Sequence, residues 1–350
     1  MKTTATLKKP FDWSVLKPGF LNSGGLKGNL YTFLSILAFI GIWHIGATWL
    51  FNIEADRKIQ KALTEQGAPA AEEMKACIAS GKVKCQPNTL PTPVQVMGGF
   101  GTLWADHKVI AADKRAFKAK TAKVNASRAA KGLSPIKYTG RPSFLDQVGT
   151  SIKTVLAGVL LAMVLAIPIG IVLGLSSRLK SSLNWIIQVF KPVSPVVWLL
   201  LVFMIVKTAI TNADMDKSFI ISFISVGLCS MWATLVNTSV GVSSVDKDYI
   251  NVASVLQLST FKKVFKVILP ASLPMIFTGL RITVSVAWMV LIAIELLAQS
   301  PGLGSFVWEE FQNGANDSNA KIIVAMFVIG LIGFALDRIM MYIQNAMSFK

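Results

Sequence analysis

The chain has 350 residues, of which 53% are hydrophobic and 15% are charged. This composition is far too apolar for a soluble globular protein of that length. The formal net charge of +17 could suit a nucleic-acid-binding protein, but no aromatic and basic recognition motif accompanies it. Many basic residues instead lie beside apolar runs, as the positive-inside rule describes. We therefore expect membrane lipid, and not nucleic acid, around this chain.

Six apolar segments are long enough to cross a bilayer, which takes about 20 residues in a helix. Charges are rare inside the first five and include Lys191, Arg281 and Glu295. The sequence predicts an all-α, polytopic membrane protein with six transmembrane helices over residues 30–51, 153–176, 182–206, 218–242, 271–297 and 322–343.

The charge distribution predicts which side of the membrane each end occupies. Residues 1–29 carry five lysines and a single acid, Asp12, which favours a cytoplasmic tail. The first apolar run, 30–51, begins late and lacks a small-x-small cleavage site, so we do not expect a cleaved signal peptide. Short connections with excess Lys and Arg then place the C-terminus and residues 243–270 in the cytoplasm as well.

Residues 52–145 form an external insertion by this topology, although they carry 16 Lys and Arg against 7 Asp and Glu. Long loops are translocated largely regardless of charge. The insertion reads as a short helix pair over 54–80, an amphipathic stretch Val94–Trp104 and a basic helix over 107–131. The basic helix is either a solvated surface or a docking site for an acidic partner or anionic lipid headgroups.

The insertion also contains two of the three cysteines. Cys77 and Cys85 flank a loop with a glycine, and an external location is oxidising, so we predict a disulfide, with two free thiols as the alternative. Only His107 could add a third metal ligand, and no metal site is expected. Cys229 lies in an apolar span and reads as a core residue.

Enzyme motifs are missing from the sequence. It has no G-x-x-x-x-G-K-[ST] phosphate loop, no G-x-S-x-G and no H-E-x-x-H. We expect no catalytic residue and no cofactor on this chain, so the energy for moving a solute would come from another chain.

The most informative segment is 251–270, a basic connection between two apolar runs. Its Ala253 and its ending Ile268-Leu269-Pro270 resemble the E-A-A-x-x-x-G … I-x-L-P loop of binding-protein-dependent ABC importer permeases. Asn251 and Gln257 stand where that loop has Glu and Gly, and with Phe277–Ile282 the segment resembles the nitrate branch of the nitrate/sulfonate/bicarbonate permeases.

Further motifs carry the same resemblance. Leu90–Pro93 is similar to the family's L-P-[ST]-P after the first span, and Lys191–Trp198 to its K-P-V-S-P-L-A-W. The sequences Phe306–Glu310 and Leu336–Arg338 fit its end. The resemblance covers about 30–51, 88–106 and 144–343, which makes 146–350 the permease core.

The resemblance implies an inner-membrane importer subunit that pairs with a second permease copy, two ABC ATPase subunits and a periplasmic substrate-binding protein. It favours nitrate as the cargo over nitrite, cyanate, bicarbonate or a sulfonate. A secondary transporter and a membrane scaffold are the competing classes. The residues implied to couple to the ATPase are Asn251, Ala253, Ser254, Gln257, Ser259, Ile268, Leu269 and Pro270.

The physical pattern of 243–270 supports a projecting loop. We expect a short helix over 249–257, a break at Ser259–Thr260 and a second helix over 261–268, with Pro270 stopping that helix or starting the next span. Small residues such as Ala253 and Ser254 would let the loop seat closely in a partner. An amphipathic connector lying on the membrane is the alternative.

Charges inside spans are functional-site candidates. Arg281 lies roughly 15 Å beyond Pro270 along a helix, near mid-membrane. With Lys191 and Glu295 it forms our hypothesis for an anion pathway. Alternatively, Arg281 pairs with an acid such as Asp337 and holds helices together. Prolines at 168, 192 and 195 would kink the second and third spans.

Overall fold

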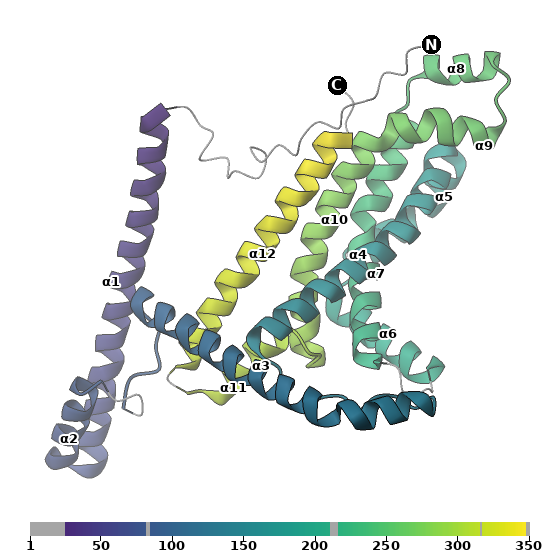
Figure 1. Cartoon of the computed structure of the whole chain (residues 1–350). Coiled ribbons are helices and arrows are strands. Elements are labelled where there is room, and N and C mark those ends of the chain that lie inside the picture. Colours follow the sequence, from purple (N-terminus) through teal and green to yellow (C-terminus); the bar gives the residue numbers. More distant parts are fainter. Residues whose placement is uncertain (1–24, 82–84, 211–215, 316, 348–350) are drawn as a thin grey trace.

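The computed structural model describes residues 25–81, 85–210, 216–315 and 317–347, and these form helices with no strand. The all-α prediction is therefore confirmed, while residues 1–24 of the expected tail lie outside the described part. In chain order the helices are α1 Gly25–Gln66, α2 Ala68–Ala79, α3 Pro93–Ala130, α4 Phe144–Leu175, α5 Ser177–Phe190, α6 Pro195–Ala209, α7 Lys217–Ser243, α8 Lys247–Val255, α9 Thr260–Lys263, the π-helical turn η3 Val264–Ile268, α10 Leu269–Ala298, α11 Leu303–Asn313 and α12 Ser318–Met347 (Figure 1).

Helix α7 lies at the centre of the bundle, with α4 along one side and α10 along another. The contact between α4 and α7 depends on small residues. A Cβ atom on Gly158 would lie 2.7 Å from Cγ1 of Val226, and one on Gly170 would lie 2.7 Å from Cβ of Thr238. In a membrane, where lipid is as apolar as a leucine side chain, such close backbone approach drives helix association.

Hydroxyl groups join α7 to α10. The Oγ1 atoms of Thr234 and Thr283 are 2.7 Å apart, and the Thr283 hydroxyl also donates to the Ser230 carbonyl at 3.1 Å. Both threonines are fully buried. These bonds satisfy polar groups that would otherwise lie unpaired in an apolar interior.

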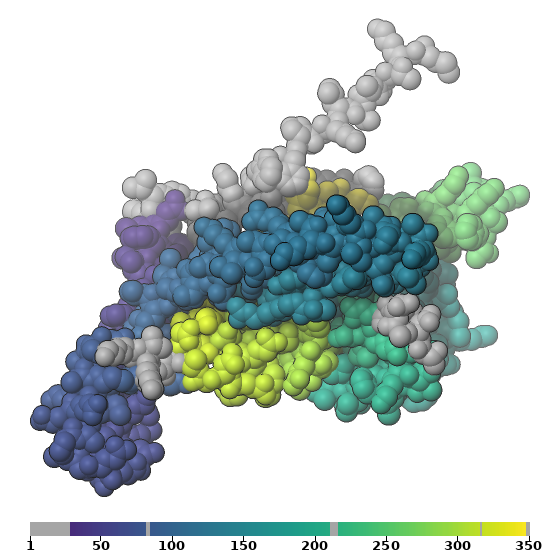
Figure 2. Space-filling model, turned by 60° about the horizontal axis from the view of Figure 1, so that its bottom comes forward, coloured from purple at the N-terminus to yellow at the C-terminus, as the bar shows by residue number. Residues whose placement is uncertain are grey.

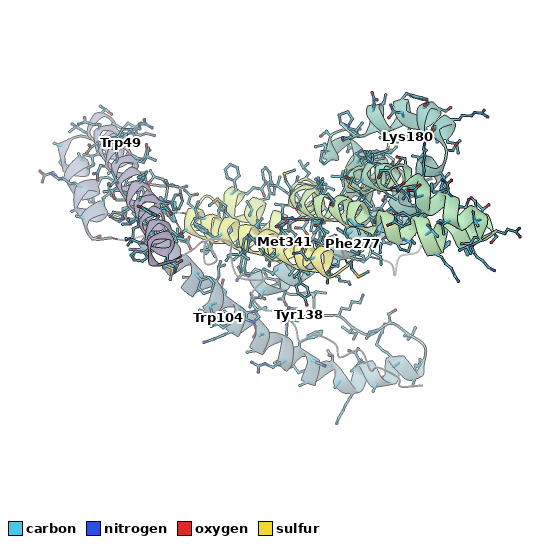
Figure 3. The ribbon with its side chains drawn as sticks, turned by 90° about the horizontal axis from the view of Figure 1, so that it is seen from above. Trp49, Trp104, Tyr138, Lys180, Phe277 and Met341 are labelled. Carbon is cyan, nitrogen blue, oxygen red and sulfur yellow. A yellow bond between two sulfur atoms is a disulfide. The ribbon has the colours of Figure 1, made fainter. Side chains whose placement is uncertain are left out.

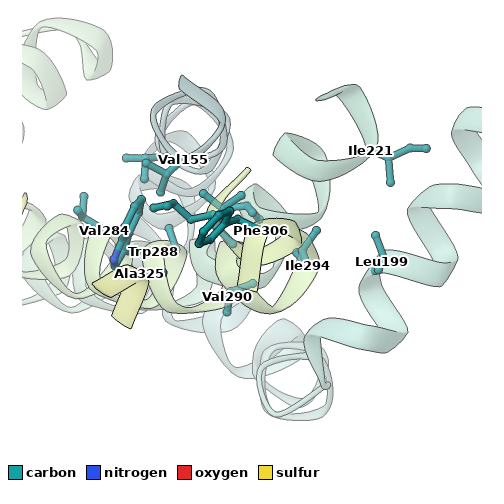
Figure 4. Packing of buried hydrophobic residues seen from close by; sticks show 14 of the residues in the cluster. Val155, Leu199, Ile221, Val284, Trp288, Val290, Ile294, Phe306 and Ala325 are labelled. Carbon is teal, nitrogen blue, oxygen red and sulfur yellow. The ribbon is translucent and has the colours of Figure 1, made fainter. Parts of the chain in front are cut away.

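The largest apolar cluster contains side chains of α4, α10, α11 and α12 and extends to α3, α6 and α7. Figure 4 shows Val155, Trp288, Phe306 and Ala325 pointing toward one another there. The rings of Phe144 and Phe306 are 4.9 Å apart in an edge contact. This cluster fixes the end of the bundle at which α11 sits.

The predicted third span is not one helix. The structure has five helices long and apolar enough to cross a membrane, or six if the pair α5 and α6 counts as one span, and this pair is bent by 99°. The single helix over 182–206 is therefore wrong. Ser194 caps α6 by accepting from the Val196 N–H, and Pro195 occupies its first turn, where a proline costs no hydrogen bond.

The bend is stabilised by aromatic packing. Phe190 at the end of α5 stacks on Trp232 of α7 with ring centroids 6.4 Å apart, and Trp198 of α6 lies 5.9 Å from Phe190. In place of the kinks expected at 192 and 195, the chain therefore turns sharply between α5 and α6. Pro168, by contrast, lies inside the unbroken helix α4.

Helix α1 is peripheral and longer than predicted. It includes residues 30–51 but continues to Gln66, and α2 folds back along it. Most of its large apolar side chains are exposed. Trp43 ties it to the bundle, since its Nε1 donates to the Pro91 carbonyl at 3.1 Å and its ring lies 5.7 Å from that of Phe327.

The predicted amphipathic stretch Val94–Trp104 and basic helix 107–131 are one helix, α3. Thr92 begins it with a capping box, in which Thr92 and Gln95 bond each other's backbone N–H groups. Helix α3 crosses the bundle at the end that carries α2 and α11 (Figure 1). The start of α1, the pair α8–α9 and the end of α12 lie at the opposite end (Figure 1).

The glycine contact can be tested with a matched pair of substitutions in α4. Gly158→Val should lower the free energy of unfolding by about 1–3 kcal/mol, because the new side chain overlaps Val226. Gly149→Val should have a much smaller effect, since nothing lies within 4 Å of a Cβ at Gly149. The midpoint of thermal unfolding in detergent measures both, and equal midpoints would contradict the packing argument.

Candidate functional site

The projecting segment α8–α9 is the first candidate site, and its fold begins with local capping. Asp246 accepts from the Asp248 N–H at 3.0 Å and starts α8. At the other end the Leu258 N–H donates to the Ala253 carbonyl at 3.1 Å and the Gln257 N–H to the Ser254 carbonyl at 3.0 Å. This pair of bonds is the Schellman arrangement that ends many helices.

Gln257 has the left-handed conformation that this ending requires, with φ 49°. It stands where the importer loop has Gly in the motif described above. A left-handed residue is usually Gly because it has no Cβ to clash. The departure at Gln257 therefore keeps the geometry of the motif while changing its residue.

The second half of the segment differs from prediction. The break expected at Ser259–Thr260 lies at 256–259, and α9 then continues through η3 into α10 without interruption. Pro270 does not stop a helix; it occupies the first turn of α10, which confirms the alternative that it starts the next span. The wider π turn just before it accommodates the missing proline N–H.

Some predicted coupling residues point into the molecule. Ala253 is only 1% exposed, and Ile268 packs with Val264 and Val242. Lys263 Nζ donates to the Ser254 hydroxyl at 3.0 Å, which links α9 to α8. The small size of Ala253 serves packing within the chain, and its contact with a partner stays a prediction.

Other predicted residues remain on the surface of the segment. Asn251, Ser254, Gln257, Ser259 and Pro270 are exposed, and Leu269 is half-buried. The segment thus has two faces. One is buried against the chain and contains Ala253 and Ile268, and the other is exposed. Only the exposed face is available for contact.

Sequence reasoning missed an apolar surface on this unit. Val255 is 82% and Phe261 72% exposed, and the rings of Phe261 and Phe265 lie 4.4 Å apart. The spacing of Tyr249, Val252 and Val255 along one side of α8 was the available signal. We call the exposed group the apolar tip; it comprises Tyr249, Val252, Val255, Leu256, Phe261 and Phe265. Exposed apolar clusters of this kind mark contact sites.

The second candidate site contained Lys191, Arg281 and Glu295, and the structure does not bring them together. Arg281 makes a two-pronged ion pair with Asp337, with Nε to Oδ1 at 2.7 Å and Nη2 to Oδ2 at 2.9 Å. The alternative that Arg281 holds helices together is thus confirmed for α10 and α12. A paired arginine presents little free positive charge to an anion.

Lys191 lies exposed at the end of α5, and no ion pair in the described ranges involves it. Glu295 lies 14 residues beyond Arg281 on α10, or about 21 Å along the helix. The three charges therefore do not form one site.

Glu295 has a structural position instead. It is 1% exposed, accepts from the Ser151 hydroxyl at 2.8 Å and from the Gly304 N–H at 3.0 Å. The Ser151 hydroxyl oxygen also accepts from the Leu303 N–H at 2.8 Å. The carboxylate sits at the N-terminus of α11, where negative charge is favourable. The pathway hypothesis for Glu295 is not supported, because the group is enclosed by α4, α10 and α11.

Cys77 and Cys85 are joined by a disulfide in the structure, with Cα atoms 5.8 Å apart. The bond closes the end of α2, where Gln86 Nε2 also donates to the Ile78 carbonyl at 3.1 Å. Within the ranges that the structure describes, no group of three or more His, Cys, Asp or Glu could hold a metal ion.

The geometry of Gln257 predicts opposite effects for two glycine substitutions. Gln257→Gly should raise the free energy of unfolding by up to about 1 kcal/mol, because it relieves a left-handed residue. Asn251→Gly should lower it by about 0.5–1 kcal/mol, since Asn251 lies in the interior of α8. Thermal unfolding of both variants measures this, and the same sign for both would refute the assignment.

The role of Glu295 predicts a loss of stability. Glu295→Ala should cost about 1–3 kcal/mol for each buried donor left unpaired, namely the Gly304 N–H and the Ser151 hydroxyl. Glu309→Ala, at an exposed position of α11, is the control and should be nearly neutral. A fully stable Glu295→Ala protein that no longer transports would instead assign Glu295 to the pathway.

Comparisons with known proteins agree on one family. The family model described as binding-protein-dependent transport system inner membrane component matches residues 166–349. The nitrate import permease protein NrtB of Synechococcus elongatus is 35% identical over 173 residues, which is 49% of this chain and 59% of that protein. Its counterpart in Leptolyngbya laminosa is 36% identical over 199 residues, 57% and 67% of the two chains.

A bicarbonate transport system permease protein, CmpB of a Synechocystis species, is 37% identical over 171 residues, 49% of this chain and 57% of that protein. The chain thus spans 57% to 67% of the length of these three relatives. Among solved structures, an inward-facing MetNI methionine ABC transporter chain is 16% identical with a TM-score of 0.48, over 59% of this chain and 96% of that one.

Proposed function

Because this chain belongs to the family of binding-protein-dependent transport system inner membrane components, we propose that it forms the pore of an ATP-driven importer for a small oxyanion, with nitrate as the cargo. The single observation that carries the proposal is the apolar tip on α8–α9, at the end of the bundle where α12 ends (Figure 1). Exposed apolar side chains at the end of a membrane bundle mark a protein or membrane contact, and we assign this contact to a protein partner.

The partner of the apolar tip is the ATPase subunit in this proposal. The sequence has no phosphate-binding loop, so ATP and Mg²⁺ would be bound by the partner. The buried contacts of Ala253 and Ile268 hold the tip to the bundle. A push on Val255 or Phe261 therefore reaches α10 through the helical continuity of α9, η3 and α10.

A second copy of the chain completes the pathway in this proposal. The glycine contacts between α4 and α7 and the buried threonines between α7 and α10 leave no room for an ion between these helices. The ion would therefore pass between two copies. A substrate-binding protein would deliver it at the end that carries α3 and α11, opposite the tip.

Nitrate is supported by the two nitrate permease relatives at 35% and 36% identity. Bicarbonate is the second candidate, since the bicarbonate permease relative is 37% identical. Both are small anions with a single negative charge. With Arg281 paired to Asp337, discrimination between them would rest on the substrate-binding protein.

The function is tested by reconstitution. The chain, co-expressed with the ATPase and binding protein encoded beside its gene, should take up nitrate into liposomes only when ATP is supplied. Labelled bicarbonate in place of nitrate distinguishes the two cargoes. Uptake that runs on a proton gradient without the ATPase would overturn the proposal in favour of a secondary transporter.

The apolar tip gives a sharper test. Val255→Asp with Phe261→Asp should weaken co-purification of the ATPase and reduce uptake by about tenfold or more, as for truncation of an interface hot spot. Val109→Asp, at an exposed apolar position on α3, is the control and should retain the ATPase. Normal ATPase retention by the tip variant would exclude this surface as the contact.

A further inference from the structure

Helix α3 has a position and a surface that the proposed function leaves unused. It lies at the end of the bundle opposite the apolar tip and runs across the other helices rather than along them (Figure 1). Seen from above, it extends away from the bundle past Trp104 toward the segment that carries Tyr138 (Figure 3). Figure 2 shows it as a ridge across this face.

One side of α3 is committed to packing. Val96, Gly99, Leu103 and Ile110 are buried, and a Cβ on Gly99 would lie 3.2 Å from that of Ala320. This side docks the first half of the helix on the bundle. It leaves the neighbouring side of the helix open.

The second half of α3 packs on its own return segment, residues 131–143. The rings of Phe117 and Tyr138 lie 5.5 Å apart, and Asn125 exchanges two hydrogen bonds with the backbone of Ile136. An ion pair between Lys114 and Asp146 of α4 fixes its base. Residues 114–145 therefore form a braced arm, which we call the basic arm.

The basic arm carries a high positive charge. Residues 114–145 contain no Asp or Glu. Its basic residues are Lys114, Arg115, Lys118, Lys120, Lys123, Arg128, Lys131, Lys137 and Arg141. Lys114 and Arg141 are neutralised by Asp146 and Asp106, and no ion pair in the described ranges involves the other seven.

A single exposed stripe joins an apolar half to a basic half. Positions at three- and four-residue steps share one side of a helix, and this stripe follows such steps along α3. Its first part is apolar with an aromatic end, and its second part is basic between alanines. Its members are Met97, Phe100, Trp104, Lys108, Ala111, Arg115, Lys118 and Ala122, and all but the half-buried Ala111 are exposed.

We propose that this stripe rests on the outer surface of the membrane and binds the headgroups of anionic phospholipids. Met97 and Phe100 enter the acyl boundary, and Trp104 lies at headgroup level, where amphipathic aromatic rings accumulate. Lys108, Arg115 and Lys118 then meet lipid phosphates. A charged protein partner would explain the basic half alone, whereas a lipid surface explains both halves on one line.

The first test measures lipid binding by the purified full chain. Native mass spectrometry with phosphatidylglycerol and phosphatidylcholine should show preferential retention of phosphatidylglycerol. The triple variant Lys108→Gln, Arg115→Gln, Lys118→Gln should lose about fivefold in retention for each charge removed. The control Lys120→Gln, Lys123→Gln, Lys131→Gln removes the same charge from outside the stripe, at two positions on the other exposed side of α3 and at its C-cap residue. It should stay within about twofold of the parent chain.

Equal losses of phosphatidylglycerol retention in both triple variants would show that lipid is attracted by the overall charge and not by the stripe, and would overturn the proposal. Unchanged phosphatidylglycerol retention in the stripe variant would overturn it too, and loss of an acidic co-purified protein from that variant would assign the stripe to a protein partner. Matching thermal midpoints for the three proteins show that the fold is kept.

The second test measures depth. A fluorophore is attached at Ala122→Cys or at Ser127→Cys, both exposed positions, in a Cys229→Ser background in nanodiscs of mixed phosphatidylcholine and phosphatidylglycerol. A nitroxide on the lipid headgroups should quench the label at 122, on the stripe, at least about twice as strongly as the label at 127, on the other side of the helix. Equal quenching at the two positions contradicts the placement of the stripe.

Discussion

The close contact of α7 with α4 and α10 is the interaction on which the rest of the structure depends. Gly158 and Gly170 bring the backbones of α4 and α7 together, and the Thr234–Thr283 bond fixes α10 on the other side. In a lipid environment, packing and buried hydrogen bonds replace the hydrophobic effect as the force between helices. Helices α5, α6, α11 and α12 are then positioned against this fixed centre.

Rigid packing at the centre explains why the contact surfaces lie at the two ends and the periphery. The apolar tip projects from one end, and α3 crosses the other (Figure 1). Each exposes large apolar side chains to water, such as Val255 on the tip and Phe100 on α3. The charged side chains inside the bundle, by contrast, bind groups of the chain itself. Arg281 forms an ion pair with Asp337, and Glu295 accepts hydrogen bonds from Ser151 and Gly304.

The sequence pattern predicted those features of the fold that depend on residues close together in the chain. Hydropathy predicted the helical spans, and the residues of 243–270 indicated two short helices with a break between them. Tertiary contacts decided the remainder. The bend at 191–194 needs Trp232 of a distant helix, Ala253 is buried by η3, and Arg281 finds a partner 56 residues away. No periodicity reports such pairings, which is why the sequence left the Arg281–Asp337 pair open beside the pathway hypothesis.

The unbroken run from Thr260 to Ala298 has a mechanical consequence. It is 39 residues long, roughly 58 Å along the helical path, and it contains the π turn η3 and Pro274, two features at which helices bend. One end bears the tip, and the other is clamped where Glu295 meets the start of α11. A displacement of the tip is then divided between bending at η3 and Pro274 and a tilt of α10 about its clamped end. Weakening the contacts of the Glu295 carboxylate should therefore let that end of α10 shift, in addition to lowering the stability.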